Sequence, residues 1–369
     1  NISSEAKLAH VLSITKREKW FLSYFRYLYS DEKMFPHDIR PVDPALNKQL
    51  MQHFQGERSG FCQVGKEKFT LPARYADQAE GYYNLPLRKD DVFIATFPRS
   101  GTTMCQDLVW LINNGHDYER AADLPINERV PFLEFSILHH PELHEEVLVA
   151  NNHDPAAAAI LSHLRTPGYE WSEGMTGPRH FKTHLPFSLL PPNLLDTSKV
   201  IYIARNPIDV AVSYFHHNRL LKVHDYKGDF ETYWNYFQDG FVAYGPHIPH
   251  VLQAWKLRSH KNMLFIFYED IIQDLQKVIR RVSNFLNKPI TEAQMNRLVN
   301  HLQIDNFRNS AKLLKSDVIG MANKNEQGFI RKGGKGQKDD EFSEELRARA
   351  EKWIAETLSG TDLRFPKYK

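Results

Sequence analysis

Four stretches of this chain combine hydroxyl residues, cations and an imidazole in patterns that suit binding of phosphate-like anions. The first reads Ser100-Gly101-Thr102-Thr103 and follows the apolar run 91–97. A glycine lets the backbone approach an anion closely, and the N–H groups that open a helix have no partner within it. We therefore expect a phosphate-binding loop over residues 99–104. An ordinary helix N-cap uses the same residue types, and the glycine–lysine pair of nucleoside triphosphatases is missing.

The second stretch places a cation and an imidazole two residues apart. The predicted strand His180–Lys182 ends here, so that Lys182 and His184, two residues apart, point to the same side. At the carboxyl end of a parallel strand they would face the crevice in which such sheets bind ligands. A strand edge carrying solvated polar residues is the alternative.

Two further stretches are basic. Arg205 ends an apolar run and precedes a predicted helix over 207–221, a position suited to bidentate phosphate binding. Ser213 lies two turns further along that helix. An ion pair between Arg205 and Asp209 is the alternative for this stretch. The other basic stretch, 331–333, reads Arg-Lys-Gly in a loop and fits either an anion site or a solvated basic loop.

Short apolar runs that alternate with helical patterns supply the elements that must position these residues. This alternation predicts an α/β fold, a single domain with a central, mostly parallel sheet flanked by helices. Residues 1–84 show no strong strand pattern and are expected to form an N-terminal arm with helices, followed by the α/β domain over 85–369. The expected strands are Val92–Phe97, His180–Lys182, Val200–Ala204 and Met263–Tyr268, and the expected helices are 101–114, 207–221 and 271–286.

Residues 136–178 look like an insert and hold five histidines. A metal site and a mobile, solvated lid both fit, and the lack of an accompanying cysteine pattern favours the lid. Asp154 followed by Pro155 predicts that a helix begins inside it. Residues 310–340 are rich in glycine, lysine and asparagine, which is typical of a loop.

Composition narrows the class of protein. The chain has 369 residues, 42% of them hydrophobic and 25% charged, with a formal net charge of +2, which is typical of a globular protein and gives no indication of nucleic-acid binding. Cys62 and Cys105 are too few for a disulfide scaffold. No apolar run is long enough to cross a bilayer. We expect a cytoplasmic protein that works on small molecules, with neither nucleic acid nor membrane as a partner.

Taken together, the four stretches resemble the cytosolic sulfotransferase family. They look like its 5′-phosphosulfate loop, its Lys-Thr-His-Leu-Pro strand, its Arg-Asn-Pro 3′-phosphate motif and its Arg-Lys-Gly loop. Tyr268–Asp270 and Val130–Phe135 match two more family segments, and all six occur in the family's order from about residue 85 onward. The first loop and the insert look closer to insect members, including the insect retinol dehydratase, than to mammalian ones.

The resemblance implies transfer of a sulfuryl group from 3′-phosphoadenosine 5′-phosphosulfate (PAPS) to a hydroxyl of a small apolar phenol, alcohol, retinoid or steroid. Adenosine 3′,5′-bisphosphate (PAP) would be the second product. By position, His184 would be the general base, and Lys182 and Arg99 would be cations on the transferring group, so that no metal is needed. Phe132 and Phe135 would line the acceptor site. The donor would be held by Arg99, Ser100, Gly101, Thr102, Thr103, Met104, Arg205, Ser213, Tyr268, Phe307, Phe329, Arg331, Lys332 and Gly333.

The chain departs from the family pattern at several positions. Arg99 stands where lysine is usual, so a planar fork replaces a compact donor, and Met104 stands where a tryptophan usually stacks on adenine. The family's short dimer motif is not reproduced in 338–348, so a homodimer would need another interface. Two other activities fit the same motifs: elimination through a sulfate ester, as in retinol dehydratase, and nucleotide binding without turnover. The presence of both Lys182 and His184 argues against the second.

Overall fold

The computed structural model describes residues 34–367 except 304, 308–317, 327 and 330–340. The elements described below all belong to the compact unit His37–Lys369. Within the described residues, no helix has both the length and the apolar character needed to cross a membrane.

The central sheet has four parallel strands in the order β5-β4-β6-β7. They are β4 (Val92–Thr96), β5 (His180–Thr183), β6 (Lys199–Ala204) and β7 (Met263–Phe267). All five residues of β4 are buried, as expected for a strand covered on both faces. The predicted parallel sheet is therefore confirmed, and each strand ends within one residue of its predicted bounds.

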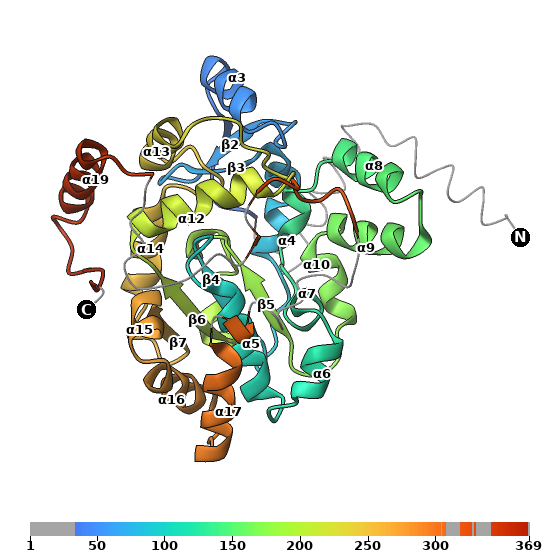
Figure 1. The fold of residues 1–369 in the computed structure, drawn as a ribbon, viewed down its shortest axis with the longest axis vertical. Helices are drawn as coiled ribbons and strands as arrows, with labels where there is room; N and C mark the ends of the chain where they lie inside the picture. Colours follow the sequence, from blue (N-terminus) through green and yellow to red (C-terminus); the bar gives the residue numbers. More distant parts are fainter. Residues whose placement is uncertain (1–33, 304, 308–317, 327, 330–340, 368–369) are drawn as a thin grey trace, which may run out of the picture. The chain divides into compact units, whose positions relative to one another are not determined.

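Helices cover both faces of this sheet (Figure 1). Ile94, Ile201 and Ile266 point to one face, where they pack in a core with α5 (Thr102–Asn113), α16 (Leu275–Leu286) and α17 (Glu292–Leu302). On the other face, Tyr202 of β6 bonds to His250 of α14 (His247–Lys256). Helix α5 ends shortly before Gly115, whose left-handed backbone, with φ +67°, is typical of the residue that follows a helix.

Two of the three predicted helices are single helices, and the third is not. α5 and α12 (Pro207–Leu220) match their predictions, but 271–286 contains the end of α15 (Tyr268–Gln273) and then α16. The break lies at Asp274, whose carboxylate accepts a hydrogen bond from the Lys277 N–H and caps α16.

The described part of the N-terminal segment contains helices, as expected, and also strands that the sequence did not predict. An antiparallel sheet is formed by β1 (Ile39–Pro41), β2 (Phe61–Val64) and β3 (Phe69–Pro72). Strands of three or four residues are too short to show a clear alternation. Thr70 of β3 exchanges backbone hydrogen bonds with Tyr244 and Gly245, which places this sheet beside the 240–246 loop.

The insert consists largely of short helices. α8 (Pro141–Ala150) and α9 (Pro155–Arg165) pack on each other, and Asp154 caps α9 as predicted. α10 (Gly168–Trp171) and the 3-10 helix η3 (Ser172–Gly174) follow. The expectation of solvated histidines was wrong for His139, which is fully buried. Among the described residues, no group of three or more His, Cys, Asp or Glu side chains lies close enough to hold a metal ion.

The other described helices are short or lie outside the central sheet. They are α3 (Pro44–His53), η1 (Ala73–Asp77), α4 (Ala79–Tyr83), α6 (Tyr118–Asp123), α7 (Ile126–Arg129), η2 (Phe135–Ile137), η4 (Phe187–Leu189), α11 (Leu194–Thr197), α13 (Phe230–Gln238) and α19 (Glu344–Thr357).

Candidate active site

The segments that follow the four parallel strands carry most of the predicted site residues. The strands are in register at their carboxyl ends: Ala95 pairs with Thr183, Thr96 with Ile203, and Ala204 with Phe267. Residues 97–101, His184, Arg205 and Tyr268 come directly after these ends, so they start from the same edge of the sheet. Ligand crevices of parallel sheets lie at this edge.

The loop between β4 and α5 has the geometry of an anion site. Arg99 and Gly101 both have left-handed backbone, with φ of +67° and +103°. Gly101 is the N-cap of α5, and no side chain caps the helix, so its first N–H groups are left for a ligand. The buried Ser100 hydroxyl has no hydrogen-bond partner. The alternative that these hydroxyl residues only form an ordinary helix N-cap therefore does not hold. Thr103, the last of them, is half-buried in the first turn of α5.

Gly101 is also required by the ring that packs on it. A Cβ at this position would lie 2.6 Å from Cδ2 of Tyr268. The Arg205 guanidinium lies 4.4 Å from the centroid of the same Tyr268 ring and donates to the Arg99 carbonyl oxygen at 3.2 Å. Asp209 is 3.9 Å from Arg205 Nε, so the alternative ion pair coexists with these loop contacts.

Arg99 joins two of the predicted donor-binding stretches. Its Nε donates to Ser213 Oγ at 3.1 Å, and its Nη2 donates to the Phe329 carbonyl oxygen at 2.9 Å. The guanidinium also lies 4.8 Å from the centroid of the Phe329 ring. Arg99, Ser213 and Phe329 are therefore neighbours, although up to 230 residues separate them in sequence. Arg331, Lys332 and Gly333 lie outside the described residues.

Met104 and Phe307, both predicted to bind the donor, lie in the core that the sheet forms with α5, α16 and α17. Both side chains are buried there, and Tyr268 packs against the same core. The structure thus places Met104, Phe307 and Tyr268 in one apolar region next to the phosphate-binding loop.

His184 has a defined orientation. Its Nδ1 lies 2.8 Å from the Thr96 carbonyl oxygen and 3.1 Å from Thr96 Oγ1. Since the carbonyl can only accept, we assign the proton of the neutral ring to Nδ1, which leaves Nε2 with a free lone pair. Thr96 Oγ1 is in turn 2.7 Å from Thr102 Oγ1, so hydrogen bonds connect His184 to the phosphate-binding loop.

The environment of His184 keeps its ring neutral. The side chain is 6% exposed, which is inconsistent with a solvated strand edge. Burial, and then the charge of Lys182, lower its pKa well below the usual 6.5. A neutral imidazole with an unprotonated Nε2 is the form that accepts a proton from a substrate.

Two buried side chains that sequence reasoning missed hold the backbone around His184. The carboxylate of Glu134 accepts from the His184 N–H at 2.6 Å and from Thr183 Oγ1 at 2.9 Å, and burial raises its pKa to about 7. His250 Nε2 lies 2.8 Å from the His184 carbonyl oxygen. Glu134 could have been found from the sequence, because it is a lone glutamate within the apolar segment Val130–Phe135. The sequence around His250 contains no comparable signal.

The predicted acceptor residues lie next to the predicted base. Backbone hydrogen bonds join residues 131–133 to Lys182, so that the Phe132 segment runs parallel to β5. The Phe132 ring lies 5.0 Å from the His184 ring and 5.8 Å from the Phe135 ring, centroid to centroid. The ring of Tyr244, a residue that sequence reasoning missed, lies 5.5 Å from His184 on another segment.

Lys182 lies over one of these rings. Its Nζ is 3.9 Å from the Phe132 centroid, within cation–π range. Burial lowers the pKa of Lys182 to about 8; the Glu134 carboxylate opposes this shift and Arg99 adds to it. The site therefore combines a neutral imidazole, cations and open helix N–H groups at one sheet edge.

Comparison with known proteins gives consistent results. Residues 89–362 match the Sulfotransferase domain family. The luciferin sulfotransferase of Photinus pyralis is 32% identical over 87% of this chain and 85% of its own length. Sulfotransferase 1A1 of Rattus norvegicus is 31% identical over 79% of this chain and 92% of its own length. A structure of retinol dehydratase with androsterone and the inactive cofactor PAP superposes with a TM-score of 0.82 and 38% identity, covering 90% of this chain and 99% of that one. A second structure of retinol dehydratase, with retinol and PAP, superposes with a TM-score of 0.83 and 37% identity, and also covers 90% of this chain and 99% of that one.

Proposed function

Since the chain belongs to the sulfotransferase family and is therefore a PAPS-dependent enzyme, we propose that it sulfates the hydroxyl of an elongated apolar alcohol, with His184 as the general base. One observation carries the assignment of His184: its Nδ1 is held by Thr96, whose hydroxyl also contacts Thr102 of the phosphate-binding loop. The base and the loop are thus parts of one hydrogen-bonded unit.

The loop between β4 and α5 fits the phosphosulfate group of PAPS. The open N–H groups of α5, the unpartnered Ser100 hydroxyl and the close approach allowed by Gly101 are what a tetrahedral anion needs. Arg205, Ser213 and Tyr268 lie beside this loop and would hold the rest of the nucleotide, with Arg205 on the 3′-phosphate. PAPS, when bound, supplies the sulfuryl group and leaves as PAP.

The residues around the acceptor then have distinct tasks. The acceptor oxygen forms its bond to sulfur as the bond between sulfur and the phosphate oxygen breaks, and His184 Nε2 takes the hydroxyl proton. Lys182 and Arg99 stabilise the negative charge that passes to the leaving phosphate. Phe132 and Phe135 hold the apolar part of the acceptor against the imidazole.

Incubation with PAPS and a panel of retinol, phenols and steroids tests this proposal. PAP release above the level without enzyme, together with a product that has gained a sulfate, is the expected result. A product that has instead lost water indicates elimination through a sulfate ester. Absence of excess PAP release with every acceptor contradicts the proposal and favours nucleotide binding without turnover.

The charge on Lys182 predicts how the rate depends on pH. Because its pKa is lowered to about 8, Lys182 loses its proton as the pH rises through that value. The rate constant kcat/KM for PAPS reports ionisations of the free enzyme, so it should decline above about pH 8. Lys182→Arg, which keeps its charge, should move the decline to higher pH. A profile for this variant that overlies the wild-type profile between about pH 6 and pH 10 would assign the alkaline decline to another group.

We also propose that residues 136–178 form a lid over the acceptor. Their C-terminal part is fixed to the acceptor segment, because the Gly168 N–H donates to the Leu133 carbonyl oxygen at 2.9 Å. A Cβ at Gly168 would lie 2.3 Å from that oxygen, so the two backbones approach as closely as glycine allows. Retinol and androsterone, the compounds bound by the similar retinol dehydratase, are elongated and apolar, as a covered site requires.

Replacing α8 and α9 by a short glycine–serine linker should raise KM for retinol-sized alcohols roughly tenfold, which corresponds to about two methylene groups of lost apolar burial. Small phenols, which do not reach the lid, should keep their KM. Steady-state kinetics with both substrate sizes provides the measurement. The lid would be contradicted if KM rose equally for both substrate sizes. It would also be contradicted if PAP alone, without an acceptor, protected α8 and α9 of the wild type from proteolysis.

A further inference from the structure

His139 is a buried imidazole whose hydrogen-bonding groups are unused. It lies four residues after Phe135, directly before His140, the N-cap of α8. Its side chain is 0% exposed, and neither ring nitrogen has a hydrogen-bond partner. Burial lowers its pKa to about 3, so that at neutral pH the ring offers one N–H donor and one lone pair. Buried polar groups in native proteins are nearly always paired, so an unpaired one indicates a missing partner.

The protein groups around His139 do not supply that partner. Phe135 presents a ring edge-on, with 6.1 Å between centroids. The Arg74 guanidinium donates to the His139 carbonyl oxygen rather than to its ring. His144, whose ring centroid is 5.6 Å away, has a buried Nδ1 that is itself unpaired. The charges of Arg74 and Arg165 further disfavour protonation of His139, so the ring stays neutral.

The position of His139 connects it to the reacting centre. A continuous row of ring contacts runs from His184 to Phe132 at 5.0 Å, on to Phe135 at 5.8 Å, and on to His139 at 6.1 Å. Phe132 and Phe135 are the proposed acceptor residues, so the Phe135 ring connects His139 to the proposed acceptor site.

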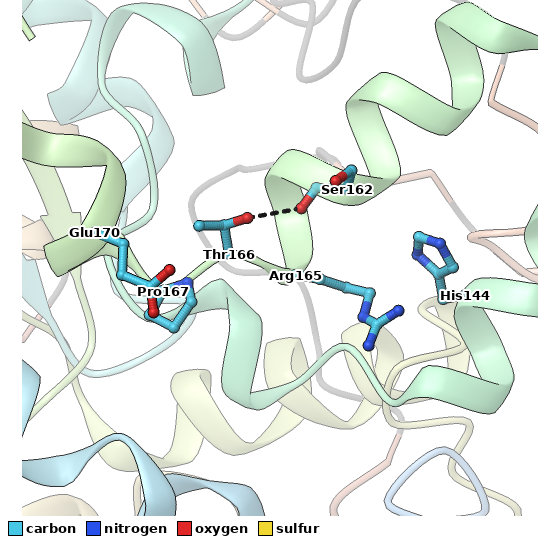
Figure 2. Close-up of a pocket in the computed structure, with 6 residues that line it drawn as sticks. All are labelled: His144, Ser162, Arg165, Thr166, Pro167 and Glu170. Atoms are coloured by element: carbon cyan, nitrogen blue, oxygen red, sulfur yellow. Dashed lines mark hydrogen bonds between the residues drawn. The ribbon is translucent and has the colours of Figure 1, made fainter. Parts of the chain in front are cut away.

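Beyond His139 the row leads toward the lid helices. His144 of α8 lines a cavity of about 320 Å³ together with Arg165 and Glu170. Figure 2 shows the Arg165 side chain extending from the end of α9 toward His144. Arg165 and Glu170 thus place polar groups around His144, the next ring after His139 in the row.

We propose that His139 is a specificity-determining residue that hydrogen-bonds to a second oxygen, hydroxyl or carbonyl, at the far end of an elongated acceptor whose reacting hydroxyl lies at His184. This inference rests on the proposed function, because Phe132 and Phe135 must line the acceptor site. The neutral ring suits either oxygen: its N–H donates to a carbonyl, and its lone pair accepts from a hydroxyl. An acceptor without that oxygen leaves the imidazole unpaired and is disfavoured.

Androsterone and the androstanol that lacks its ring-D carbonyl test the proposal as a matched pair. The wild-type enzyme should prefer androsterone in kcat/KM by roughly tenfold, the range of one buried hydrogen bond. His139→Phe should abolish the preference through a higher KM for androsterone, and His139→Gln, which keeps a donor and an acceptor, should restore part of it. The control His163→Phe alters an exposed histidine of α9 and should keep the wild-type preference.

The outcomes separate this inference from the proposed function. Three results overturn the role of His139 alone. The wild type turns over phenol and both steroids but shows no preference between the steroids, it turns over phenol but neither steroid, or His139→Phe keeps the wild-type preference. Failure of the wild type to turn over any acceptor overturns both. Thermal unfolding shows whether His139→Phe folds, and His139→Leu takes its place if it does not.

Discussion

Replacing His184 with alanine should lower kcat by a factor on the order of 10²–10⁴ and leave the affinity for PAP nearly unchanged. The variant loses the Nε2 lone pair that we propose takes the proton of the acceptor hydroxyl. The loop between β4 and α5 should keep its backbone geometry, because Gly101 is the N-cap of α5 and no side chain caps this helix. Single-turnover rates with a phenol and calorimetric titration with PAP give the two quantities.

His163→Ala, which removes an exposed histidine of α9, provides the control and should change neither quantity. A near-normal kcat in His184→Ala would transfer the role of base to another group. If His184 is the base, its protonated imidazole is the inactive form, and burial holds the pKa of this ring well below 6.5. Activity on the acid side should therefore persist to pH values clearly below 6.5.

Arg205→Ala should weaken PAP binding by roughly 10- to 100-fold, because a charge-assisted hydrogen bond contributes about 1.5–3 kcal/mol. The affinity for adenosine 5′-monophosphate, which lacks the 3′-phosphate, should fall much less in the same variant. The guanidinium is held in place by the Tyr268 ring and by the Arg99 carbonyl oxygen, so it is ordered before the nucleotide binds. Calorimetric titration of both nucleotides measures the difference.

Arg219→Ala is a matched control for Arg205→Ala, since Arg219 lies near the C-terminal end of α12 and pairs with Glu326. It should leave both affinities close to wild type. Equal losses of the two nucleotides in Arg205→Ala would place this guanidinium on the 5′ side or in a structural role.

The parallel sheet and the edge that carries the site were predictable from the sequence. Parallel strands are buried on both faces and read as continuous apolar runs, and side chains directly after them meet at one edge. For this reason Ser100, His184, Arg205 and Tyr268 could be grouped although long stretches separate them. The roles of all the predicted site residues stay predictions, and so do the domain division at residue 84, the cytoplasmic location and a homodimer. Arg331, Lys332 and Gly333 also lie outside the described residues.

What the sequence did not reveal depends on partners distant in the chain. Glu134 acts on His184 fifty residues away, and His250 acts on it from sixty-six residues away, so neither belongs to a local motif. The break at Asp274 depends on one side-chain cap inside an otherwise helical pattern. In the insert, the burial of His139 depends on how the helices pack, which residue type alone does not indicate.

The hydroxyl of Thr96 has a further consequence, because a hydroxyl carries one proton. Nδ1–H of His184 donates to the Thr96 carbonyl oxygen at 2.8 Å and lies 3.1 Å from Thr96 Oγ1, so the Thr96 hydroxyl proton is free to point at Thr102 Oγ1. The Thr102 hydroxyl proton is then free to point at the phosphate of PAPS. If Nε2 gains the acceptor proton, as proposed, the positive charge on the ring strengthens the bonds from Nδ1–H to Thr96 and, through the Thr96 hydroxyl, the bond to Thr102. Deprotonation of the acceptor and stabilisation of the departing phosphate would thus be two ends of one polarised relay, so that the step that creates the nucleophile also assists the leaving group.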